Sequence, residues 1–368
     1  MDFESTVYRI GVEEHPNADR LEMAGVEGYR CVVGKGDFQS GDLAAYIPED
    51  SIVPDDIIKD LGLEGRLSGG AKNRVKAVRL RGELSQGLLY PLTGKRLREN
   101  KPWRNWFCAL IGWGRREWRE GDDVTDVLGL KKYESPIPVH MRGPGWRSGS
   151  TVKFDIENIK KWTKIFEPGE QVVVTEKMHG TWCCLGLNVD KGPIVSSKGN
   201  SARGISFKIG VDDDEKWANV YINAWKEWGD KVEELSGRFE ASVYVLGEVF
   251  GKGVQDLQYG EQKPVFAAFD IYVGEPGEGR YLNPDEFSHV VKDVFPTVPV
   301  IYQGPFDWHK VPEWTNGKTL WNPEFNSNHI REGCVVRPKK EEICRIGRKI
   351  LKSVSADYLL RKGGTEFN

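Results

Sequence analysis

The sequence is poor in cysteine, and its cysteines form no recognisable pattern. The six that it contains include no C-x-x-C pair and no histidine at the spacing of a zinc site. Cysteines of this kind are expected to stay reduced and to be buried as small hydrophobic side chains. A zinc module and a disulfide-stapled scaffold are therefore not predicted.

Long apolar runs and a phosphate-binding glycine loop are also missing. No apolar stretch approaches the roughly 20 residues that span a bilayer, and the acidic segment 1–15 lacks the basic-then-apolar order of a secretory signal. The segment GYRCVVGKG (28–36) has the wrong spacing for a G-x-x-x-x-G-K-[ST] loop, which disfavours P-loop phosphoryl transfer. We expect a protein of the cytoplasm or nucleoid that is neither secreted nor inserted in a membrane.

Neither sign of charge dominates. The formal net charge is −3, with 52 basic and 55 acidic residues, and this excludes a globally basic, histone-like binder of nucleic acid. The basic residues nevertheless gather in short segments, which leaves room for local contacts with nucleic acid. These segments are 74–82, 94–101, 115–119 and 160–164.

At 368 residues the chain is long enough for two or three domains of roughly 100–200 residues each. In the first 134 residues, short strand-like runs alternate with Gly, Pro and Asp turn signals, which predicts a small β-barrel or sandwich. The Pro- and Gly-rich segment 135–150 is interpreted as a linker. Residues 151–368 combine strand-like runs with helix candidates at 212–237 and 283–295, so an α+β domain is predicted.

The most informative stretch is VVVTEKMHGTWCCLG (172–186). An apolar strand ends in Lys177, and His179 and Gly180 follow after one residue. A lysine on a rigid strand is a suitable covalent nucleophile when burial or nearby cations lower the pKa of its amine, and a glycine beside it permits close approach of a ligand. A lysine at a strand end and a hydrogen-bonded core histidine would give the same tetrapeptide, so K-x-H-G alone decides nothing.

Five further segments follow in order on predicted strands: SSKGNSAR (196–203), VLGEVFG (245–251), VFAAFDIYV (265–273), REGCVVRP (331–338) and GRKILKSVS (347–355). Taken singly, the key residue of each segment could be an ordinary surface carboxylate, a core aromatic side chain or an exposed basic side chain. Together with K-x-H-G-T at 177–181 they resemble the motifs of ATP-dependent RNA ligases in the covalent nucleotidyltransferase superfamily, which also contains DNA ligases and mRNA capping enzymes. The form with histidine is similar to phage double-strand RNA ligases and trypanosome editing ligases.

This resemblance implies ATP and Mg²⁺, or Mn²⁺, as cofactors, and five catalytic residues. Lys177 would form a lysyl-AMP, His179 would orient the site, and Lys352 would reach the α-phosphate. Glu248 and Glu332 would be the metal-linked carboxylates, with one of them on the ribose. Two departures stand out in this sequence, because Trp182 replaces a common Asn and Ile350 replaces the first lysine of a K-x-K motif.

The resemblance also implies a nucleotide-binding set around these residues. Phe269 would stack on adenine, Asp270 would support the site, Val335 would pack on the base, and Arg203 would touch the RNA end or the nucleotide. The full expected set is Glu176, Gly180, Arg203, Phe269, Asp270, Val335, Arg337 and Lys349, where Lys349 is the candidate substitute for the missing lysine.

The N-terminal part resembles the OB-fold of tRNA-binding modules through HPNADRLEMAGVEG (15–28) and RLRGELSQGLL (79–89). An OB domain before a ligase domain is similar to the Deinococcus-type RNA ligases, which seal nicks with an RNA 3′-hydroxyl end. The resemblance therefore implies a monomer acting on nicked duplex RNA or an RNA–DNA hybrid. Expected contacts with nucleic acid are Arg74, Lys76, Arg79 and Arg81 on one strand face, and Arg115 and Arg116 in a Trp-rich insert.

Three other interpretations of the sequence are each less consistent with its features. A DNA ligase or capping enzyme would carry its OB domain after the catalytic one, and about 16 residues follow Lys352 in this sequence. A non-catalytic RNA-binding protein would not need Lys177, Glu248, Glu332 and Lys352 together. A tRNA-synthetase fragment would show an ATP-binding signature that we do not find.

Overall fold

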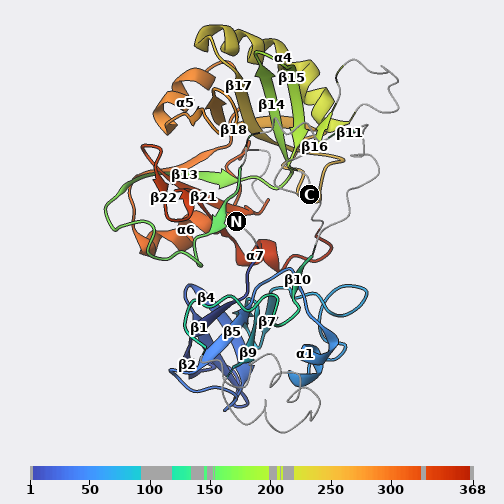
Figure 1. Cartoon of the computed structure of the whole chain (residues 1–368), viewed down its shortest axis with the longest axis vertical. Coiled ribbons are helices and arrows are strands. Elements are labelled where there is room, and N and C mark those ends of the chain that lie inside the picture. The colour runs from blue at the N-terminus through green and yellow to red at the C-terminus, as the bar shows by residue number, and fades with distance from the viewer. Residues whose placement is uncertain are drawn as a thin grey trace. The chain divides into compact units, whose positions relative to one another are not determined.

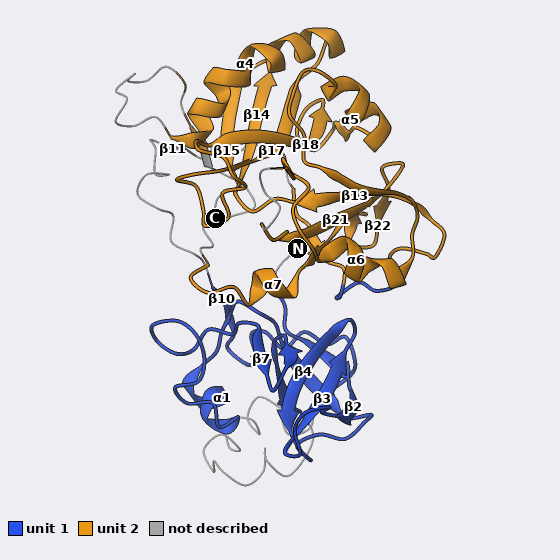
Figure 2. Cartoon of the chain, turned by 180° about the vertical axis from the view of Figure 1, so that it is seen from behind, with its two compact units in different colours: residues 1–133, 160–163 blue, residues 134–159, 164–368 orange. Residues whose placement is uncertain are grey.

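The structure is a computed structural model of the chain. It describes residues 3–92, 118–133, 145–146, 152, 154–198, 205–207, 209, 219–324 and 329–364. The chain forms two compact units, coloured separately in Figure 2. Unit 1 contains residues 1–133 and 160–163, and unit 2 contains residues 134–159 and 164–368. Most of the predicted linker at 135–150 lies outside the described residues.

Unit 1 is built almost entirely of short antiparallel strands, as the sequence predicts (Figure 1). One sheet has the order β1 (Thr6–Arg9), β5 (Leu43–Ile47), β9 (Leu88–Pro91), and another has the order β2 (Gly11–Glu14), β3 (Leu21–Val26), β4 (Tyr29–Gly34). Two-stranded pairs are formed by β6 (Ser51–Ile52) with β10 (Lys131–Lys132) and by β7 (Val78–Leu80) with β8 (Glu83–Ser85). The helix α1 (Asp55–Asp60) packs with Ile57 and Ile58 in the core.

Unit 2 contains two larger sheets. The seven-stranded sheet has the order β11 (Gly145–Trp146), β16 (Ile205–Phe207), β15 (Gly192–Ser197), β14 (Thr181–Asn188), β17 (Val243–Phe250), β18 (Val265–Val273), β19 (Arg280–Tyr281). The five-stranded sheet has the order β12 (Glu157–Asn158), β24 (Leu351–Val354), β21 (Gly333–Pro338), β13 (Gln171–Lys177), β20 (Val300–Pro305). A small hairpin joins β22 (Ile343–Cys344) to β23 (Gly347–Arg348).

Helices α4 (Val220–Phe239) and α5 (Pro284–Val291) cover one face of the seven-stranded sheet (Figure 1). Asn283 caps α5 in a capping box with Glu286, and Pro284 takes the first helical position. Short helices η4 (Trp308–Lys310), α6 (Val311–Thr315) and α7 (Ala356–Leu359) complete the unit. The predicted α+β class is confirmed. Among the described residues, no helix is long and apolar enough to cross a membrane.

The two faces of the seven-stranded sheet belong to different cores, because strand side chains alternate. Cys183 lies in the helix-covered core, whereas its neighbour Cys184 lies in a second cluster with Tyr244, Leu246 and Ile350. Ile350 directly precedes β24 of the five-stranded sheet. This second cluster therefore fills the space between the two sheets of unit 2.

Candidate active site

The chain passes from one sheet of unit 2 to the other within three residues. Lys177 ends β13 in the five-stranded sheet, and Thr181 begins β14 in the seven-stranded sheet. Residues 178–180 form this passage, which we call the crossing turn. Together with Lys177, the crossing turn forms the K-x-H-G motif, so the motif lies where the two sheets meet.

Strand register brings the terminal lysine motif to the crossing turn. Lys177 faces Gly333 across β13 and β21, and Val335 faces Lys352 across β21 and β24. Because opposite residues, and residues two apart, share a sheet face, Lys177, Val335 and Lys352 lie on one face of the five-stranded sheet. Side chains separated by more than 150 residues of sequence therefore meet here.

Lys177 is held by a carboxylate. Its Nζ donates to Oε1 of Glu332 at 2.7 Å, and the two side chains are 25% and 6% exposed. Glu332 directly precedes Gly333, the register partner of Lys177, which explains the contact. The other carboxylate oxygen, Oε2, is buried and has no hydrogen-bond partner among the described residues. A buried acceptor of this kind suits a metal ion or a ligand hydroxyl.

Glu248 and Lys352, which are also expected to be catalytic, lie in the same electrostatic environment as Lys177 and Glu332. Burial raises the pKa of Glu248 to about 8; Lys177 opposes that shift and Glu332 adds to it. Burial also lowers the pKa of Lys352 to about 8, and the cations Lys177 and Lys198 lower it further. An ammonium disfavoured by burial and like charge is stabilised by an anionic ligand. The arrangement therefore favours a phosphate-bearing ligand.

Lys198 is a site residue that the sequence interpretation missed. It belongs to SSKGNSAR, in which the expected contact was Arg203, and Arg203 lies outside the described residues. Lys198 acts on both Glu248 and Lys352, and its Nζ lies 3.2 Å from Oδ1 of Asp155. A signal was present in the sequence, because Lys198 belongs to the motif segment 196–203, and in the structure it directly follows β15.

Glu248→Gln should become more stable relative to the wild type as pH rises from 5 to 8. The raised pKa means that the folded state binds more protons than the unfolded state between about pH 4.5 and 8, so the wild type loses stability over that window. Glutamine does not titrate. The difference in free energy of unfolding should grow by at least ~1 kcal/mol, since one pKa unit corresponds to ~1.4 kcal/mol. Urea unfolding in the presence of a chelator measures it.

The matched control for that measurement is Glu313→Gln, which changes an exposed glutamate on α6. Because this side chain is exposed, its replacement should change the free energy of unfolding little. If the stability difference between Glu248→Gln and the wild type stayed constant from pH 5 to 8, burial would not raise the pKa of the Glu248 carboxyl.

Three partly buried apolar side chains border the space between the sheets. Phe269 and Val335, expected to contact the base, both pack against the cluster of Cys184 and Leu246, and so does Trp182. Trp182 is also the register partner of Glu248. Phe269 lies at the register shift between β17 and β18, and its ring lies 5.1 Å from that of Phe154. The structure thus gathers the expected base-contacting residues on one apolar surface.

Asp270 lies beneath this surface in a buried ion network. Its side chain is 1% exposed and lies 3.3 Å from Nη1 of Arg337 and 2.6 Å from Nη1 of Arg348. Arg348 also donates to both carboxylate oxygens of Glu341, at 2.7 and 2.6 Å. Arg337 is therefore paired with Asp270, and both residues stabilise the structure beneath the site.

Two expected nucleotide contacts point elsewhere. Glu176 lies on the opposite face of β13 from Lys177, and its Oε2 accepts from the backbone N–H of Leu320 at 2.7 Å. Lys349 lies 2.9 Å from Glu170 and 3.3 Å from Glu342. Lys349 is thus bound in ion pairs away from Lys352, so it does not substitute for the missing lysine. Ile350, which occupies the position of that lysine, is buried in the cluster between the sheets.

Gly180 is required by packing. A Cβ at this position would collide with the carbonyl oxygen of Val249 and lie 2.9 Å from the Cβ of Phe250. The crossing turn therefore lies against the backbone of β17, which only glycine permits. This is a different reason for the glycine from the expected approach of a ligand.

Unit 1 corrects part of the expected nucleic-acid surface. Arg74 is buried, donates to Oδ1 of Asp50 from Nε at 2.9 Å, and lies over the ring of Tyr133. Since β7 begins only at Val78, the expectation that four basic residues share one strand face is wrong. Lys76 precedes the strand, and Arg79 and Arg81 are exposed on the β7–β8 hairpin. Arg115 and Arg116 lie outside the described residues.

The expected HPNADRL motif fixes this hairpin. His15 Nε2 lies 3.2 Å from the carbonyl oxygen of Leu80, and Asn17 Nδ2 donates to that of Arg81 at 3.1 Å. Asn17 also donates its backbone N–H to His15 Nδ1 at 3.1 Å. The motif therefore has a structural role, since it holds the segment that presents Arg79 and Arg81.

Two solved forms of a ligase from Naegleria gruberi share the fold of the whole chain. The enzyme described as RNA ligase with PPi is 24% identical, with 98% of each chain covered and a TM-score of 0.75. A mutant of the same ligase with ATP and Mn is also 24% identical, with 97% of this chain and 98% of that chain covered and a TM-score of 0.75. No curated protein matches the sequence.

Two family models match the sequence. An OB-fold domain model matches residues 5–92, and unit 1 accordingly contains an OB-fold domain. The model described as RNA ligase matches residues 170–354, which is half of the chain and includes Lys177, Glu248, Glu332 and Lys352. The chain therefore belongs to the RNA ligase family.

Proposed function

We propose that this RNA ligase uses ATP to seal nicks between a 3′-hydroxyl and a 5′-phosphate through a lysyl-AMP on Lys177. The observation that carries the proposal is the geometry of Lys177, which ends a strand beside Glu332 and shares a sheet face with Lys352. The Naegleria ligase with ATP and Mn supports ATP as the nucleotide. We place the chain in the K-x-H-G branch with an N-terminal OB domain.

The proposed reaction consists of three in-line displacements at phosphorus. The neutral amine of Lys177 attacks the α-phosphorus of ATP, an N–P bond forms, and pyrophosphate leaves. An oxygen of the RNA 5′-phosphate then displaces lysine and takes the AMP. Finally the 3′-hydroxyl attacks that 5′-phosphate, the phosphodiester forms, and AMP leaves. Positioning and charge neutralisation are the main requirements of such steps.

The residues around Lys177 meet these requirements. Glu332 holds the amine, and the lysines Lys198 and Lys352 balance negative charge on the phosphates. Phe269 and Val335 offer the adenine an apolar surface.

Glu248 and Glu332 would hold the divalent cation. No cluster of three or more metal-ligating side chains occurs among the described residues, but Mg²⁺ needs only one or two carboxylates beside phosphate oxygens and water. The buried Oε2 of Glu332, without a hydrogen-bond partner in the described part of the chain, fits such a ligand. When bound, the cation would neutralise phosphate charge.

The proposed substrate is a nicked duplex RNA or an RNA–DNA hybrid, bound by a monomer. Exposed Arg79 and Arg81 on the β7–β8 hairpin of the OB-fold unit support contacts with a phosphate backbone. Hydrophobic side chains of the same hairpin, Val78 and Leu80, are 42% and 40% exposed.

Matched nicked duplexes test the substrate. Four substrates combine an RNA or DNA 3′-hydroxyl strand with an RNA or DNA template, and sealing is followed with labelled 5′-phosphate. We expect sealing wherever the 3′-hydroxyl strand is RNA, with either template. Preference for a DNA 3′-hydroxyl strand would indicate a DNA ligase, and covalent labelling by GTP alone would indicate a capping-type nucleotidyltransferase.

A further inference from the structure

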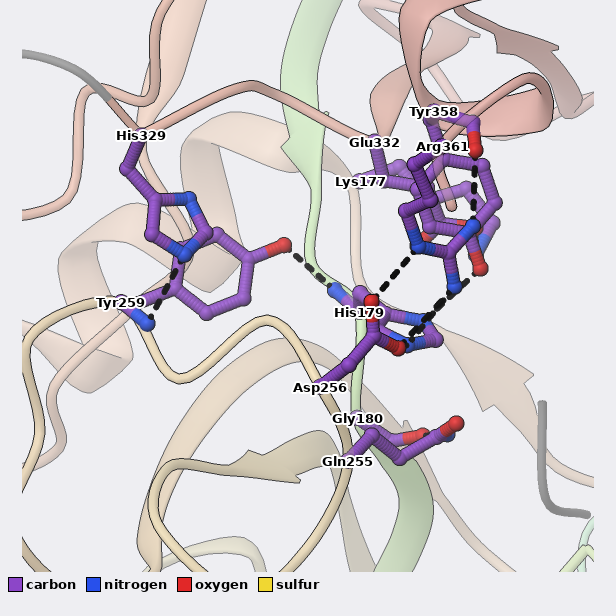
Figure 3. A network of polar contacts seen from close by, with 10 residues as sticks. All are labelled: Lys177, His179, Gly180, Gln255, Asp256, Tyr259, His329, Glu332, Tyr358 and Arg361. Atoms are coloured by element: carbon purple, nitrogen blue, oxygen red, sulfur yellow. Dashed lines mark hydrogen bonds and ion pairs between the residues drawn. The ribbon is translucent and has the colours of Figure 1, made fainter. Parts of the chain in front are cut away.

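The ring of His179 is held at both nitrogens by residues far along the chain (Figure 3). Its Nε2 lies 3.0 Å from Oδ1 of Asp256, and its Nδ1 lies 2.8 Å from the hydroxyl of Tyr358. The ring is buried and meets that of Tyr358 edge to face at 5.1 Å. His179 is therefore fixed by protein groups.

These contacts assign one tautomer. Nε2 lies 3.0 Å from Oδ1 of Asp256 and 3.3 Å from Nη2 of Arg361. Since a carboxylate oxygen only accepts, the shorter contact assigns the proton of the neutral ring to Nε2, which donates a hydrogen bond to Asp256. Nδ1 is then the acceptor, and the Tyr358 hydroxyl donates to it. The same logic orients metal-bound and catalytic histidines, where a carboxylate on one nitrogen fixes the function of the other.

Arg361 ties the two partners of His179 together. Its Nε donates to Oδ2 of Asp256 at 2.7 Å and its Nη2 to Oδ1 at 3.1 Å, while its Nη1 donates to the carbonyl oxygen of Tyr358 at 2.8 Å. The guanidinium also lies 3.7 Å from the ring centre of Tyr358. A bidentate pair of this kind restrains direction as well as distance.

The helix that carries Tyr358 is itself tied to the site. Ser355 caps α7, its backbone N–H donates to the carbonyl oxygen of Glu332 at 2.8 Å, and its hydroxyl donates to that of Arg331 at 2.9 Å. Only two residues separate Ser355 from Lys352. The end of the last ligase motif thus contacts Glu332 through Ser355, and the helix that follows contacts the crossing turn through Tyr358.

The backbone of the crossing turn has no strand ladder, and side chains replace it. The N–H of His179 donates to the hydroxyl of Tyr259 at 2.7 Å, and Gln255 donates to the carbonyl oxygen of Gly180. Buried peptide groups need such partners wherever a chain leaves a sheet. Residues 255–259 therefore fix the backbone of the turn, and Tyr358 and Arg361 fix its side chain.

We propose that Asp256, Tyr358 and Arg361 form a positioning clamp that aims Lys177 by immobilising His179. This inference rests on the proposed function, in which Lys177 is the nucleophile. One residue separates the two side chains, so a shift of His179 moves the end of β13 with it. In-line attack tolerates little misplacement, and an error of about 1 Å can cost about a hundredfold in rate.

Tyr358→Phe tests the clamp, because it removes one hydroxyl and keeps the ring. We expect the rate constant for transfer of AMP from ATP to the enzyme to fall about tenfold to a hundredfold, with little change in the KM for ATP. Sealing of a nick that already carries a 5′-adenylate should be unchanged, since that step bypasses Lys177. The ¹⁵N shifts of the His179 ring should change as its acceptor contact is lost.

Two variants of Arg361 test its part in the clamp. Arg361→Met should lose a similar factor, and Arg361→Lys should recover part of it. The control is Tyr90→Phe, a buried tyrosine of unit 1 whose hydroxyl donates to Asp60 at 3.0 Å, and it should transfer AMP like the wild type. Thermal unfolding verifies that each variant is folded.

The outcomes separate the two proposals. If the wild type accepts AMP from ATP and folded Tyr358→Phe accepts it equally fast, the clamp is overturned but the proposed function is not. Equal losses in AMP transfer and in sealing of the adenylated nick would also overturn it, because the hydroxyl would then act on the whole site. A wild type that takes no AMP would overturn the proposed function and the clamp with it.

Discussion

Lys177→Ala should lower sealing of a 5′-phosphate nick by at least about 10⁴-fold, the scale of loss when a covalent nucleophile is removed. The neighbouring lysines cannot replace it, because Lys352 lies within β24 and Lys198 follows the end of β15, so neither belongs to the crossing turn. A nick prepared with a 5′-adenylate should still be sealed within about tenfold of the wild-type rate, because the lysine is needed only to charge that end. Sealing of both substrates, followed with the same labelled strand, measures the split.

The control for this experiment is Lys231→Ala, which removes an exposed lysine of α4 paired with Glu234. It should seal both substrates like the wild type. Equal loss on the two substrates in Lys177→Ala would contradict a nucleophilic role and would indicate that the lysine mainly supports the fold or binds the nick.

Asp270→Ala should lower the free energy of unfolding by about 3–5 kcal/mol, because it leaves two buried guanidinium groups without their shared carboxylate. Arg337 has no other ion pair among the described residues, and Arg348 keeps only Glu341. Loss of this size is a large part of the stability of a typical domain. Urea unfolding followed by tryptophan fluorescence measures the change.

The matched control is Asp285→Ala, whose carboxylate lies 3.4 Å from Lys339 on the surface. Exposed pairs contribute about 0–1 kcal/mol, so this variant should unfold close to the wild type. A similarly small effect for Asp270→Ala would mean that the two arginines find other partners, and the buried network would then not be a support of the site.

The strands of unit 2 and the gathering of its motifs were predictable from sequence. Strand-like apolar runs predicted β13, β17, β18 and β21, and the resemblance of the ordered motifs to those of RNA ligases implied that Lys177, Glu332 and Lys352 belong together. The alternation of side chains along a strand also shows why the Glu176 side chain is not beside that of its neighbour Lys177. Adjacent strand residues point to opposite faces, so this placement could have been read from the period of two.

The contacts of His179 could not be predicted in the same way. Asp256, Tyr358 and Arg361 lie in a loop and after the last motif, and no periodic pattern connects them with the crossing turn. Their contacts depend on how two sheets and a short helix pack, which local sequence does not encode. The exposed position expected for Arg74 was wrong for a related reason, because Arg74 is buried in an ion pair with the partly exposed Asp50, a contact that the basic run does not reveal.

The most direct measurement is incubation of the pure chain with Mg²⁺ and α-labelled ATP, followed by denaturing electrophoresis and peptide mapping. We expect one acid-labile AMP per chain on the peptide that contains Lys177, absent from Lys177→Ala and present in Lys231→Ala. AMP found on another residue, or a folded chain that takes no label from ATP, would contradict this expectation.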